Sequence, residues 1–226
     1  MDAIIVAAGE SLRFNSGKSK VLYQLADQPI ISYSINLFNN LEYIKRIVVV
    51  TTKESLSDVD TICMRSPKCL KPVIGGETRY SSVRAGLLAL KPWRDRVAIH
   101  DAARPLLSRV LMDRLEERSR NSLVTIPGIF VTDTMKEIDT CGFVKTTHNR
   151  ERLRSIQTPQ IFHPAVIEMF PHDCNPTDEA TVAEGLGFPV LVIEGEITNL
   201  KITYKEDIDV ANSIINREGN ENWNRL

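Results

Sequence analysis

Short apolar runs alternate with helical patterns, and this alternation constrains the fold more than any other feature of the sequence. Residues 3–7 and 47–50 are apolar at every position, as in strands buried on both faces of a parallel sheet. Between them, apolar residues from 29 to 41 recur with the period of an amphipathic helix, and Pro29 lies in its first turn. A strand–helix–strand unit of this kind implies a right-handed crossover and parallel strands.

The same alternation continues along the chain. Helical patterns at residues 54–63 and 82–90 lie between further short apolar runs, which predict strands at residues 73–74, 97–99, 190–193 and 200–202. Thr203 and Glu206 have the spacing of a capping box, which predicts a final helix reaching Arg217. The predicted fold class is therefore α/β, a doubly wound and mostly parallel Rossmann-like sheet, whose ligands bind beyond the carboxyl ends of the strands.

A β-rich segment interrupts this pattern. Residues 130–132 and 143–145 are strand-like and flank a turn-forming sequence at 139–142, which predicts a β-hairpin arm at about residues 130–150. A lone two-stranded hairpin is only marginally stable in water, so the arm needs another surface to pack on. We therefore expect residues 1–226 to form a single domain with an arm inserted at about residues 130–150.

Charge and cysteine content exclude several classes of protein. The chain has 28 Lys and Arg against 29 Asp and Glu, so no overall basic field exists to hold nucleic acid or an anionic membrane. Its longest apolar stretch, residues 3–8, is too short to span a bilayer and lacks the basic flank of a secretory signal. The four cysteines form no Cys-x-x-Cys pair and no cluster with histidine. We expect a cytoplasmic chain with reduced thiols, no zinc site, no nucleic-acid partner and no membrane partner.

The segment between the first strand and the first helix is the most informative. It has roughly twenty residues without clear secondary structure, too many for a simple connection. Small residues that let the backbone approach a ligand are followed by cations that suit phosphates: Ala7, Ala8, Gly9, Arg13, Lys18 and Lys20. Neither a Walker loop nor a dinucleotide fingerprint is present. The segment predicts phosphate binding, with a solvated basic loop as the alternative.

A second cluster reads Gly-Gly-Glu-Thr-Arg at residues 75–79 and is followed by Ser82. Paired glycines let backbone amides and carbonyls meet the flat edge of a base. A serine at a helix start can bind a ligand or cap the helix. A plain glycine turn with a capping serine remains the alternative for this cluster taken alone.

A third cluster, residues 100–105, follows the strand predicted at 97–99. Asp101 could hold a magnesium ion between phosphates, and Arg104 could bind a phosphate through two parallel hydrogen bonds. A structural ion pair is the alternative. His100, beside a buried strand, fits a hydrogen-bonded structural residue better than a catalyst.

Taken together, motifs in the same order over nearly the whole chain resemble one family, the 2-C-methyl-D-erythritol 4-phosphate cytidylyltransferases of non-mevalonate isoprenoid synthesis. The matching segments are residues 7–9 with Arg13 and Lys20, 75–79, 100–105, 133–136, 158–160, 177–180 and 199–201. The resemblance implies transfer of a cytidylyl group from CTP to methylerythritol phosphate with release of pyrophosphate. It also implies magnesium, a sheet of the nucleotide-diphospho-sugar transferase type, and a homodimer whose arms reach the neighbouring subunit.

The resemblance also implies roles for individual residues. Arg13 and Lys20 match cations that stabilise the pentacoordinate α-phosphate, and Arg150 and Lys201 complete the catalytic candidates. The nucleotide-binding candidates are Ala7, Ala8, Gly9, Gly75, Glu77, Ser82, Asp101 and Ala102, and Asp101 is the metal candidate. The candidates for binding the acceptor are Arg104, Thr134, Arg150, Thr177 and Lys201, with Thr134 and Arg150 reaching it from the partner subunit.

Some positions depart from the family pattern, and two other functions remain open. Ser11, Ser19 and Val21 stand where the family usually has glycine, proline and glutamine, and Glu77 replaces an aspartate. A ribitol 5-phosphate cytidylyltransferase is similar throughout, although its first loop more often reads Ala-Gly-Gly. The alternative from another class is a catalytically silent nucleotide-binding subunit, because a fold alone does not guarantee activity.

The residue types suit this reaction on physical grounds. The nucleophile is a phosphate monoester with a second pKa of about 6, so near neutral pH it is already an anion and needs no base. What it needs is relief from repulsion as two anionic substrates approach one another. The sequence offers cations in separate motifs, and it has no recognisable Ser-His-Asp triad or carboxylate dyad.

Overall fold

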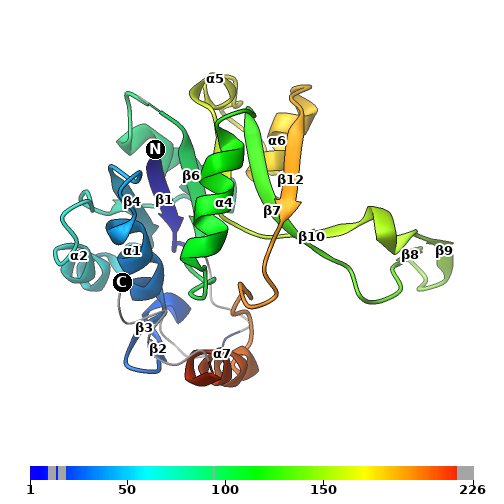
Figure 1. The fold of residues 1–226 in the computed structure, drawn as a ribbon, viewed down its shortest axis with the longest axis horizontal. Helices are drawn as coiled ribbons and strands as arrows, with labels where there is room; N and C mark the ends of the chain where they lie inside the picture. The colour runs from blue at the N-terminus through cyan, green and yellow to red at the C-terminus, as the bar shows by residue number, and fades with distance from the viewer. Residues whose placement is uncertain (10–13, 15–18, 94, 218–226) are drawn as a thin grey trace.

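The computed structural model describes residues 1–9, 14, 19–93 and 95–217, and its centre is a mixed, mostly parallel sheet (Figure 1). The strand order is β10-β7-β11-β6-β1-β4-β5, and β12 pairs with β7. The strands are β1 (Asp2–Val6), β4 (Ile47–Thr51), β5 (Val73–Ile74), β6 (Val97–Asp101), β7 (Val124–Phe130), β10 (Arg154–Ile156), β11 (Gln160–Phe162) and β12 (Val190–Glu194). β1 runs parallel to β4 and β6, whereas β10 and β11 are antiparallel to their neighbours. The predicted α/β class is confirmed.

Helices cover both faces of this sheet. They are α1 (Ile30–Asn40), α2 (Leu56–Cys63), α3 (Arg79–Ala89), α4 (Arg109–Ser119), α5 (Pro164–Ile167), α6 (Glu179–Gly185) and α7 (Glu206–Arg217). Ala3 and Ile5 of β1 pack in one core layer with α1, α2 and α4, while Ile4 packs in the other with α3, α5 and α6. Because successive side chains of a strand point to opposite faces, burial on both faces explains why this run is apolar throughout.

The start of α3 differs slightly from the expectation. The helix begins at Arg79 rather than at Ser82, because Thr78 is its N-cap and forms a capping box with Ser81. Ser81 donates its backbone N–H to Thr78 Oγ1 (3.0 Å), and its own Oγ accepts from the Thr78 N–H (2.9 Å). Ser82 therefore lies one turn into the helix and is not a cap.

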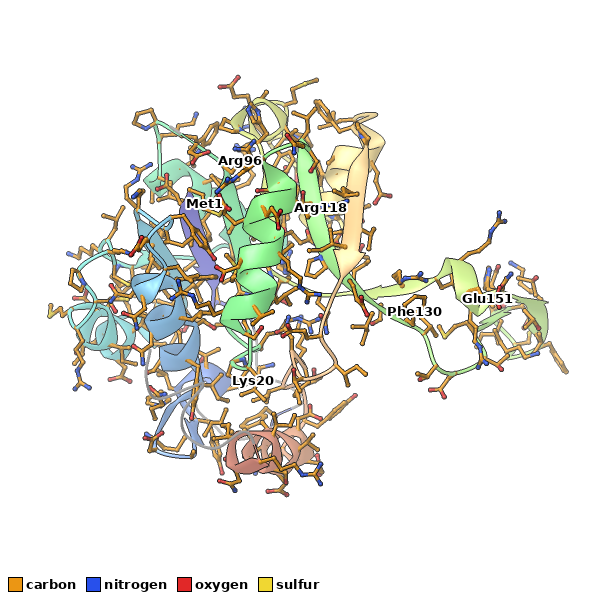
Figure 2. All side chains as sticks on the ribbon, in the orientation of Figure 1. Met1, Lys20, Arg96, Arg118, Phe130 and Glu151 are labelled. Atoms are coloured by element: carbon orange, nitrogen blue, oxygen red, sulfur yellow. The ribbon has the colours of Figure 1, made fainter. Side chains whose placement is uncertain are left out.

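The predicted hairpin projects from the body as β8 (Lys136–Ile138) and β9 (Val144–Thr147), a separate antiparallel pair (Figure 1). The expected first strand at residues 130–132 is wrong. Phe130 instead ends β7 and pairs with Arg154 of β10, so this apolar run extends the main sheet. Figure 2 shows Phe130 where the arm leaves the body and Glu151 farther out along it.

Two expectations near the C-terminus are also wrong. Residues 200–202 form no strand; Ile202 is buried beneath α7, and its N–H donates to the Ala103 carbonyl (2.8 Å). Thr203 and Glu206 do not form a capping box. Instead, the Asp207 carboxylate accepts the backbone N–H groups of Thr203 (2.6 Å) and Tyr204 (2.8 Å) ahead of a helix that begins at Glu206. Asp207, one position after Glu206 and with a shorter side chain, therefore stabilises this turn in place of the expected capping box.

The parallel register brings the carboxyl ends of β1, β4 and β6 to one edge of the sheet. The chain continues there through Ala7, Thr52 and Ala102. No helix in the described part of the chain is both long enough and apolar enough to cross a membrane.

Candidate active site

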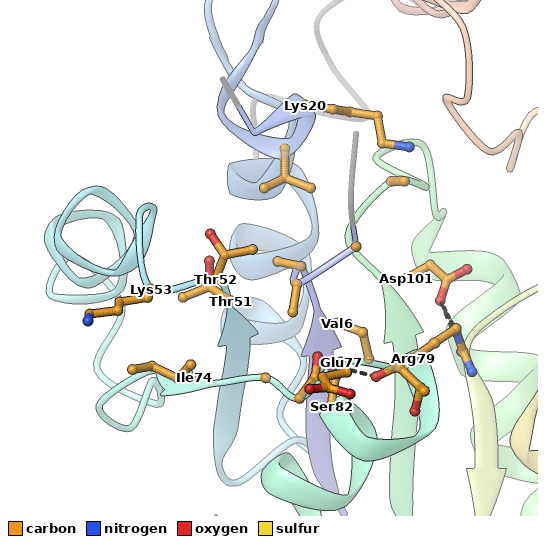
Figure 3. Close-up of a pocket in the computed structure, with 18 of the residues that line it drawn as sticks. Val6, Lys20, Thr51, Thr52, Lys53, Ile74, Glu77, Arg79, Ser82 and Asp101 are labelled. Carbon is orange, nitrogen blue, oxygen red and sulfur yellow. Dashed lines mark hydrogen bonds and ion pairs between the residues drawn. The ribbon is translucent and has the colours of Figure 1, made fainter. Parts of the chain in front are cut away.

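A pocket of about 580 Å³ opens at this carboxyl edge (Figure 3). Its walls come from the loop after β1, from residues 51–54 at the end of β4, from residues 74–79 between β5 and the start of α3, and from Asp101 at the end of β6. This is the position at which doubly wound sheets bind ligands. The pocket therefore lies at the carboxyl ends of the strands, where we expected ligands to bind.

Most of the predicted nucleotide and cation residues line this pocket. Those that do are Ala7, Ala8, Gly9, Lys20, Gly75, Glu77, Ser82, Asp101 and Lys201. Ala102 does not; it is fully buried, and its neighbour Ala103 lines the pocket instead. Arg13 and Ser11 lie outside the described residues. The structure thus gathers residues from five separate segments of the sequence around one hollow.

One wall of the pocket is tightly packed around Gly75. A Cβ atom added there would lie 2.5 Å from both Ala8 Cβ and Ser82 Oγ, so only glycine fits without movement. The Gly75 N–H donates to the Thr51 carbonyl (2.8 Å), which ties the segment to the end of β4. Ser82 Oγ lies 3.3 Å from the Gly76 carbonyl and 3.0 Å from that of Thr78. Hydrogen bonds therefore hold the backbone of residues 75–78 to the end of β4 on one side and to Ser82 of α3 on the other.

Asp101 is the charged centre of the site. Its Oδ1 accepts from Arg79 Nε (3.1 Å) and Nη2 (3.0 Å), and its Oδ2 accepts from Lys201 Nζ (2.8 Å). Burial alone would raise the pKa of Asp101, but the charges of Arg79 and Lys201 outweigh burial and hold the pKa well below its usual range. The carboxylate is therefore ionised at neutral pH and is a poor proton acceptor.

Lys20 and Lys201 line the same pocket although one belongs to the first loop and the other to the segment before α7. Lys20, in the 3₁₀ helix η2 (Lys20–Leu22), donates from Nζ to the Ile202 carbonyl at 2.8 Å. This bond ties the two cation-bearing segments together. Ser19 and Val21 flank Lys20; Ser19 Oγ is buried and has no hydrogen-bond partner among the described residues, and Val21 is part of the core.

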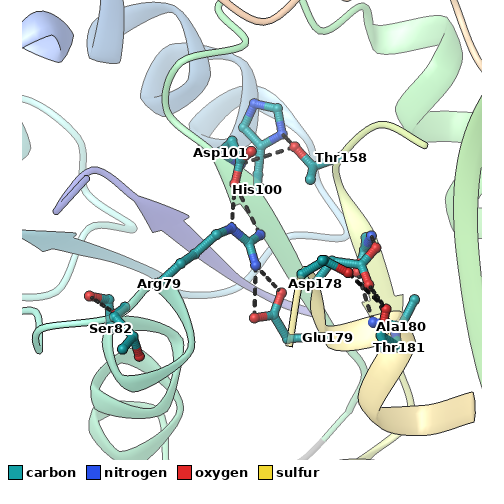
Figure 4. Close-up of polar contacts among 12 residues, drawn as sticks. Arg79, Ser82, His100, Asp101, Thr158, Asp178, Glu179, Ala180 and Thr181 are labelled. Atoms are coloured by element: carbon teal, nitrogen blue, oxygen red, sulfur yellow. Dashed lines mark hydrogen bonds and ion pairs between the residues drawn. The ribbon is translucent and has the colours of Figure 1, made fainter. Parts of the chain in front are cut away.

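His100 lies behind the pocket rather than in its lining. Its Nδ1 is 3.0 Å from Thr158 Oγ1 and its Nε2 is 3.1 Å from the Arg104 carbonyl (Figure 4). Burial lowers the pKa of His100 to about 4, so the ring is neutral at physiological pH. These contacts support the structural role expected from the sequence.

Four of the predicted acceptor residues do not line the pocket. Arg104 donates to the carbonyls of Asn199 (2.8 Å) and Ile156 (3.4 Å) and is half-buried. Thr134 and Arg150 are exposed on the arm, where Arg150 Nη1 donates to the Thr132 carbonyl (2.5 Å). Thr177 is exposed just before α6. Their predicted roles stay predictions, and those of Thr134 and Arg150 need a second subunit.

The described residues contain no group of three or more His, Cys, Asp or Glu side chains that could form a metal cage. Asp101 is the buried carboxylate facing the pocket. One buried carboxylate suits a hard divalent ion that is held mainly by substrate phosphates and water. The donor set therefore fits a cation that binds together with a phosphorylated ligand.

Two sets of lining residues were not predicted from the sequence. Residues 51–54 could have been found, because they directly follow a buried strand at the ligand-binding edge. Arg79 lies within a recognised motif, but its partner Glu179 is 100 positions away, so no local pattern connects them. The structure alone reveals this pair.

Comparisons with known proteins agree with the geometry. The family profile of 2-C-methyl-D-erythritol 4-phosphate cytidylyltransferase matches residues 1–217. The protein of that name from Caldanaerobacter subterraneus subsp. tengcongensis is 36% identical over 220 residues, covering 93% of this chain and 96% of the relative. The one from Dictyoglomus thermophilum is 38% identical over 214 residues, covering 91% of this chain and 92% of the relative. The crystal structure of 4-diphosphocytidyl-2C-methyl-D-erythritol synthase from Anaerococcus prevotii matches with a TM-score of 0.83 and 29% identity, covering 95% of each chain. The chain thus belongs to the 2-C-methyl-D-erythritol 4-phosphate cytidylyltransferase family.

Proposed function

We propose that the protein transfers the cytidylyl group of CTP to 2-C-methyl-D-erythritol 4-phosphate, forming 4-diphosphocytidyl-2-C-methyl-D-erythritol and pyrophosphate. The observation that carries this proposal is the pocket at the carboxyl edge of the sheet. It brings Gly75, Asp101, Lys20 and Lys201, the residues matched to the family motifs, around one hollow. A nucleotide fits this pocket, because its flat base suits the glycine-bounded wall and its phosphates suit the cations.

In the proposed reaction an acceptor phosphate oxygen bonds to the α-phosphorus of CTP. The bond from that phosphorus to the bridging oxygen of pyrophosphate breaks, and this oxygen keeps the electron pair. The acceptor is already an anion near neutral pH, so no protein group has to remove a proton. Asp101 is held ionised by two cations and His100 is neutral behind the pocket, which supports a reaction without a general base.

The proposed role of Lys20 and Arg13 is electrostatic. Charge develops on the oxygens around the α-phosphorus and on the leaving pyrophosphate, and fixed cations stabilise that charge more in the transition state than in the ground state. Lys20 lines the pocket and is oriented by its bond to the Ile202 carbonyl. Lys201 is positioned by Asp101 to neutralise phosphate charge beside it.

The family also needs a divalent cation, and we propose that it is Mg²⁺, held by Asp101 together with the nucleotide phosphates. Asp101 is the buried carboxylate of the pocket lining among the described residues, and it supports this assignment because Mg²⁺ typically keeps several waters and takes one or two carboxylates plus phosphates. When bound, Mg²⁺ neutralises phosphate charge and makes pyrophosphate a better leaving group. In such a complex, Lys201 would exchange part of its contact with Asp101 for phosphate.

We further propose a homodimer in which Thr134 and Arg150 complete the partner's acceptor site. The arm supports this because its apolar side chains are largely exposed, including Ile138 at 58%, Phe143 at 73% and Val144 at 57%. Exposed apolar residues on a two-stranded hairpin favour a partner surface. Thr134 and Arg150 do not line the pocket of their own chain, as expected for residues that act across an interface.

Pyrophosphate release from CTP and Mg²⁺ tests the proposed function directly. We expect release with methylerythritol phosphate and none without an acceptor. A direct competition with ribitol 5-phosphate identifies the preferred polyol, since few pocket residues separate two such substrates. Preference for ribitol phosphate would reassign the acceptor, and CTP binding without turnover on either acceptor would support the silent nucleotide-binding subunit.

A further inference from the structure

The Arg79 side chain connects two carboxylates that belong to different parts of the fold. As Figure 4 shows, its guanidinium lies between Asp101 at the end of β6 and Glu179 at the start of α6. Nε and Nη2 donate to Asp101 Oδ1 at 3.1 and 3.0 Å, and Nη1 lies 2.8 and 2.6 Å from the two carboxylate oxygens of Glu179. One planar group thus fixes the relative position of both carboxylates.

Glu179 depends on this contact. Its carboxylate is fully buried, and among the residues that the structure describes Arg79 is the one side chain bonded to it. Burial raises the pKa of Glu179, and the positive charge of Arg79 opposes that shift. Glu179 immediately follows Thr177 and Asp178, so the ion pair reaches the segment that carries a predicted acceptor-binding residue.

The start of α6 is also held without Arg79. Gln160 Nε2 donates to Asp178 Oδ2 (2.7 Å), while Gln160 Oε1 accepts the Ala180 N–H (3.2 Å). Asp178 in turn caps the helix by accepting the Thr181 N–H (2.9 Å). What Arg79 adds is the link from this helix start to Asp101, and through Asp101 to Lys201.

We propose that Arg79 is a positioning residue that fixes where the acceptor-binding residues lie relative to the nucleotide-binding residues. In this account Arg79 orients Asp101, which in turn holds Lys201, and through Glu179 it connects the start of α6, next to Thr177, to the pocket wall. The inference rests on the proposed function, because it concerns the placement of a polyol phosphate relative to the nucleotide. A buried ion pair is weak evidence for stability on its own, since well-packed apolar residues often stabilise as much. Its location at the pocket wall is what favours a positioning role.

Four variants test this role: Arg79→Gln, Glu179→Gln, the double variant, and Arg84→Gln as a matched control. Arg79→Gln alone leaves a buried, uncompensated carboxylate and can fail to fold, whereas the double variant removes both charges. Arg84 lies on the same helix, but it donates to the Pro171 carbonyl (2.8 Å) and contacts His172 (2.9 Å), away from the pocket lining.

The measurements are kcat and KM for CTP and for methylerythritol phosphate, CTP affinity by calorimetry without acceptor, and the melting temperature. We expect the double variant to stay folded and to lose much less affinity for CTP than kcat/KM for the acceptor, since Asp101 keeps its bond to Lys201. Its kcat/KM for the acceptor falls about 10- to 100-fold, the usual loss when a supporting contact is removed and reacting groups are misplaced. Arg84→Gln stays within a factor of about two.

If the double variant and Arg84→Gln had the same kcat/KM for the acceptor, the proposal would be overturned, because the ion pair would then be structural only. An equal loss of CTP affinity would also overturn it, by making Arg79 a nucleotide contact. A wild-type chain that is inactive with the acceptor would instead contradict the proposed function, so the two failures are distinguishable.

Discussion

Replacing Gly75 with alanine adds one carbon atom to the tightly packed wall of the pocket, which we propose binds the nucleotide. The added Cβ would lie 2.5 Å from Ala8 Cβ and from Ser82 Oγ, nearly 1 Å short of the 3.4 Å at which ordinary van der Waals contact begins. Gly75 cannot retreat freely, because its N–H is bonded to the Thr51 carbonyl. Relief therefore requires the glycine segment to move relative to Ala8 and Ser82, which reshapes the pocket.

The size of the effect follows from the cost of overpacking. Forcing an extra methyl group into a packed site costs about 1–3 kcal/mol. If that cost falls on the nucleotide-bound state, CTP binds about 5- to 140-fold more weakly, since each 1.4 kcal/mol is about tenfold in affinity. Titration calorimetry with CTP and Mg²⁺ measures this change, and the KM for CTP should rise with it.

Two other glycines provide matched controls. Alanine at Gly86 would approach Ile4 and Val50 at 2.8 and 2.9 Å, so it should lower the melting temperature while leaving CTP affinity unchanged. Alanine at Gly185 meets nothing within 4 Å and should change neither. Wild-type CTP affinity in a folded Gly75→Ala protein would refute the assignment of this wall to the nucleotide.

Three further predictions follow from the charges and contacts of the site. Lys20→Ala and Arg13→Ala should fold normally but lose roughly 10²- to 10³-fold in kcat in steady-state assays, as when a transition-state donor is removed; near-wild-type turnover would remove them from catalysis. Mixing an Arg150→Ala chain with a Lys20→Ala chain should restore partial activity through hybrid sites, and inactive but verified heterodimers would place each site within one chain. For His100, the folded-state pKa of about 4 lies below the unfolded value of about 6.5, so the unfolded state binds more protons between these values. The free energy of unfolding, measured with urea, should therefore fall as the pH drops from about 6.5 to 4, and it should fall less in His100→Gln; equal slopes would assign the loss to other groups.

The sequence predicted the main sheet well because its parallel strands are buried on both faces. β1 and β4 were expected within one residue of their observed ends, since complete burial leaves an apolar residue at every position. The failures occur where local β-propensity does not determine pairing. Phe130 extends the main sheet through a partner 24 positions later, and residues 200–202 form no ladder, since their backbone N–H bond to the body is the one from Ile202 to Ala103.

The site was predicted in the same uneven way. Residues within continuous motifs, such as Gly75 and Asp101, do line the pocket, because strand ends place them at one edge. The Arg79–Glu179 contact was not predicted, because it joins the starts of α3 and α6, which are 100 positions apart and meet only in the folded chain. The acceptor roles of Thr134 and Arg150 still depend on the second subunit that the arm is proposed to meet.

The pH dependence of kcat/KM for methylerythritol phosphate tests most directly whether fixed cations, rather than a base, drive the reaction. Between pH 5 and 9 Asp101 stays ionised and His100 stays neutral. We therefore expect one ionisation near pH 6, that of the acceptor phosphate, followed by a plateau. The same profile should appear at lower height in Lys20→Ala. A second ionisation above pH 7 that disappears when a protein side chain is replaced would reveal a general base and contradict the account.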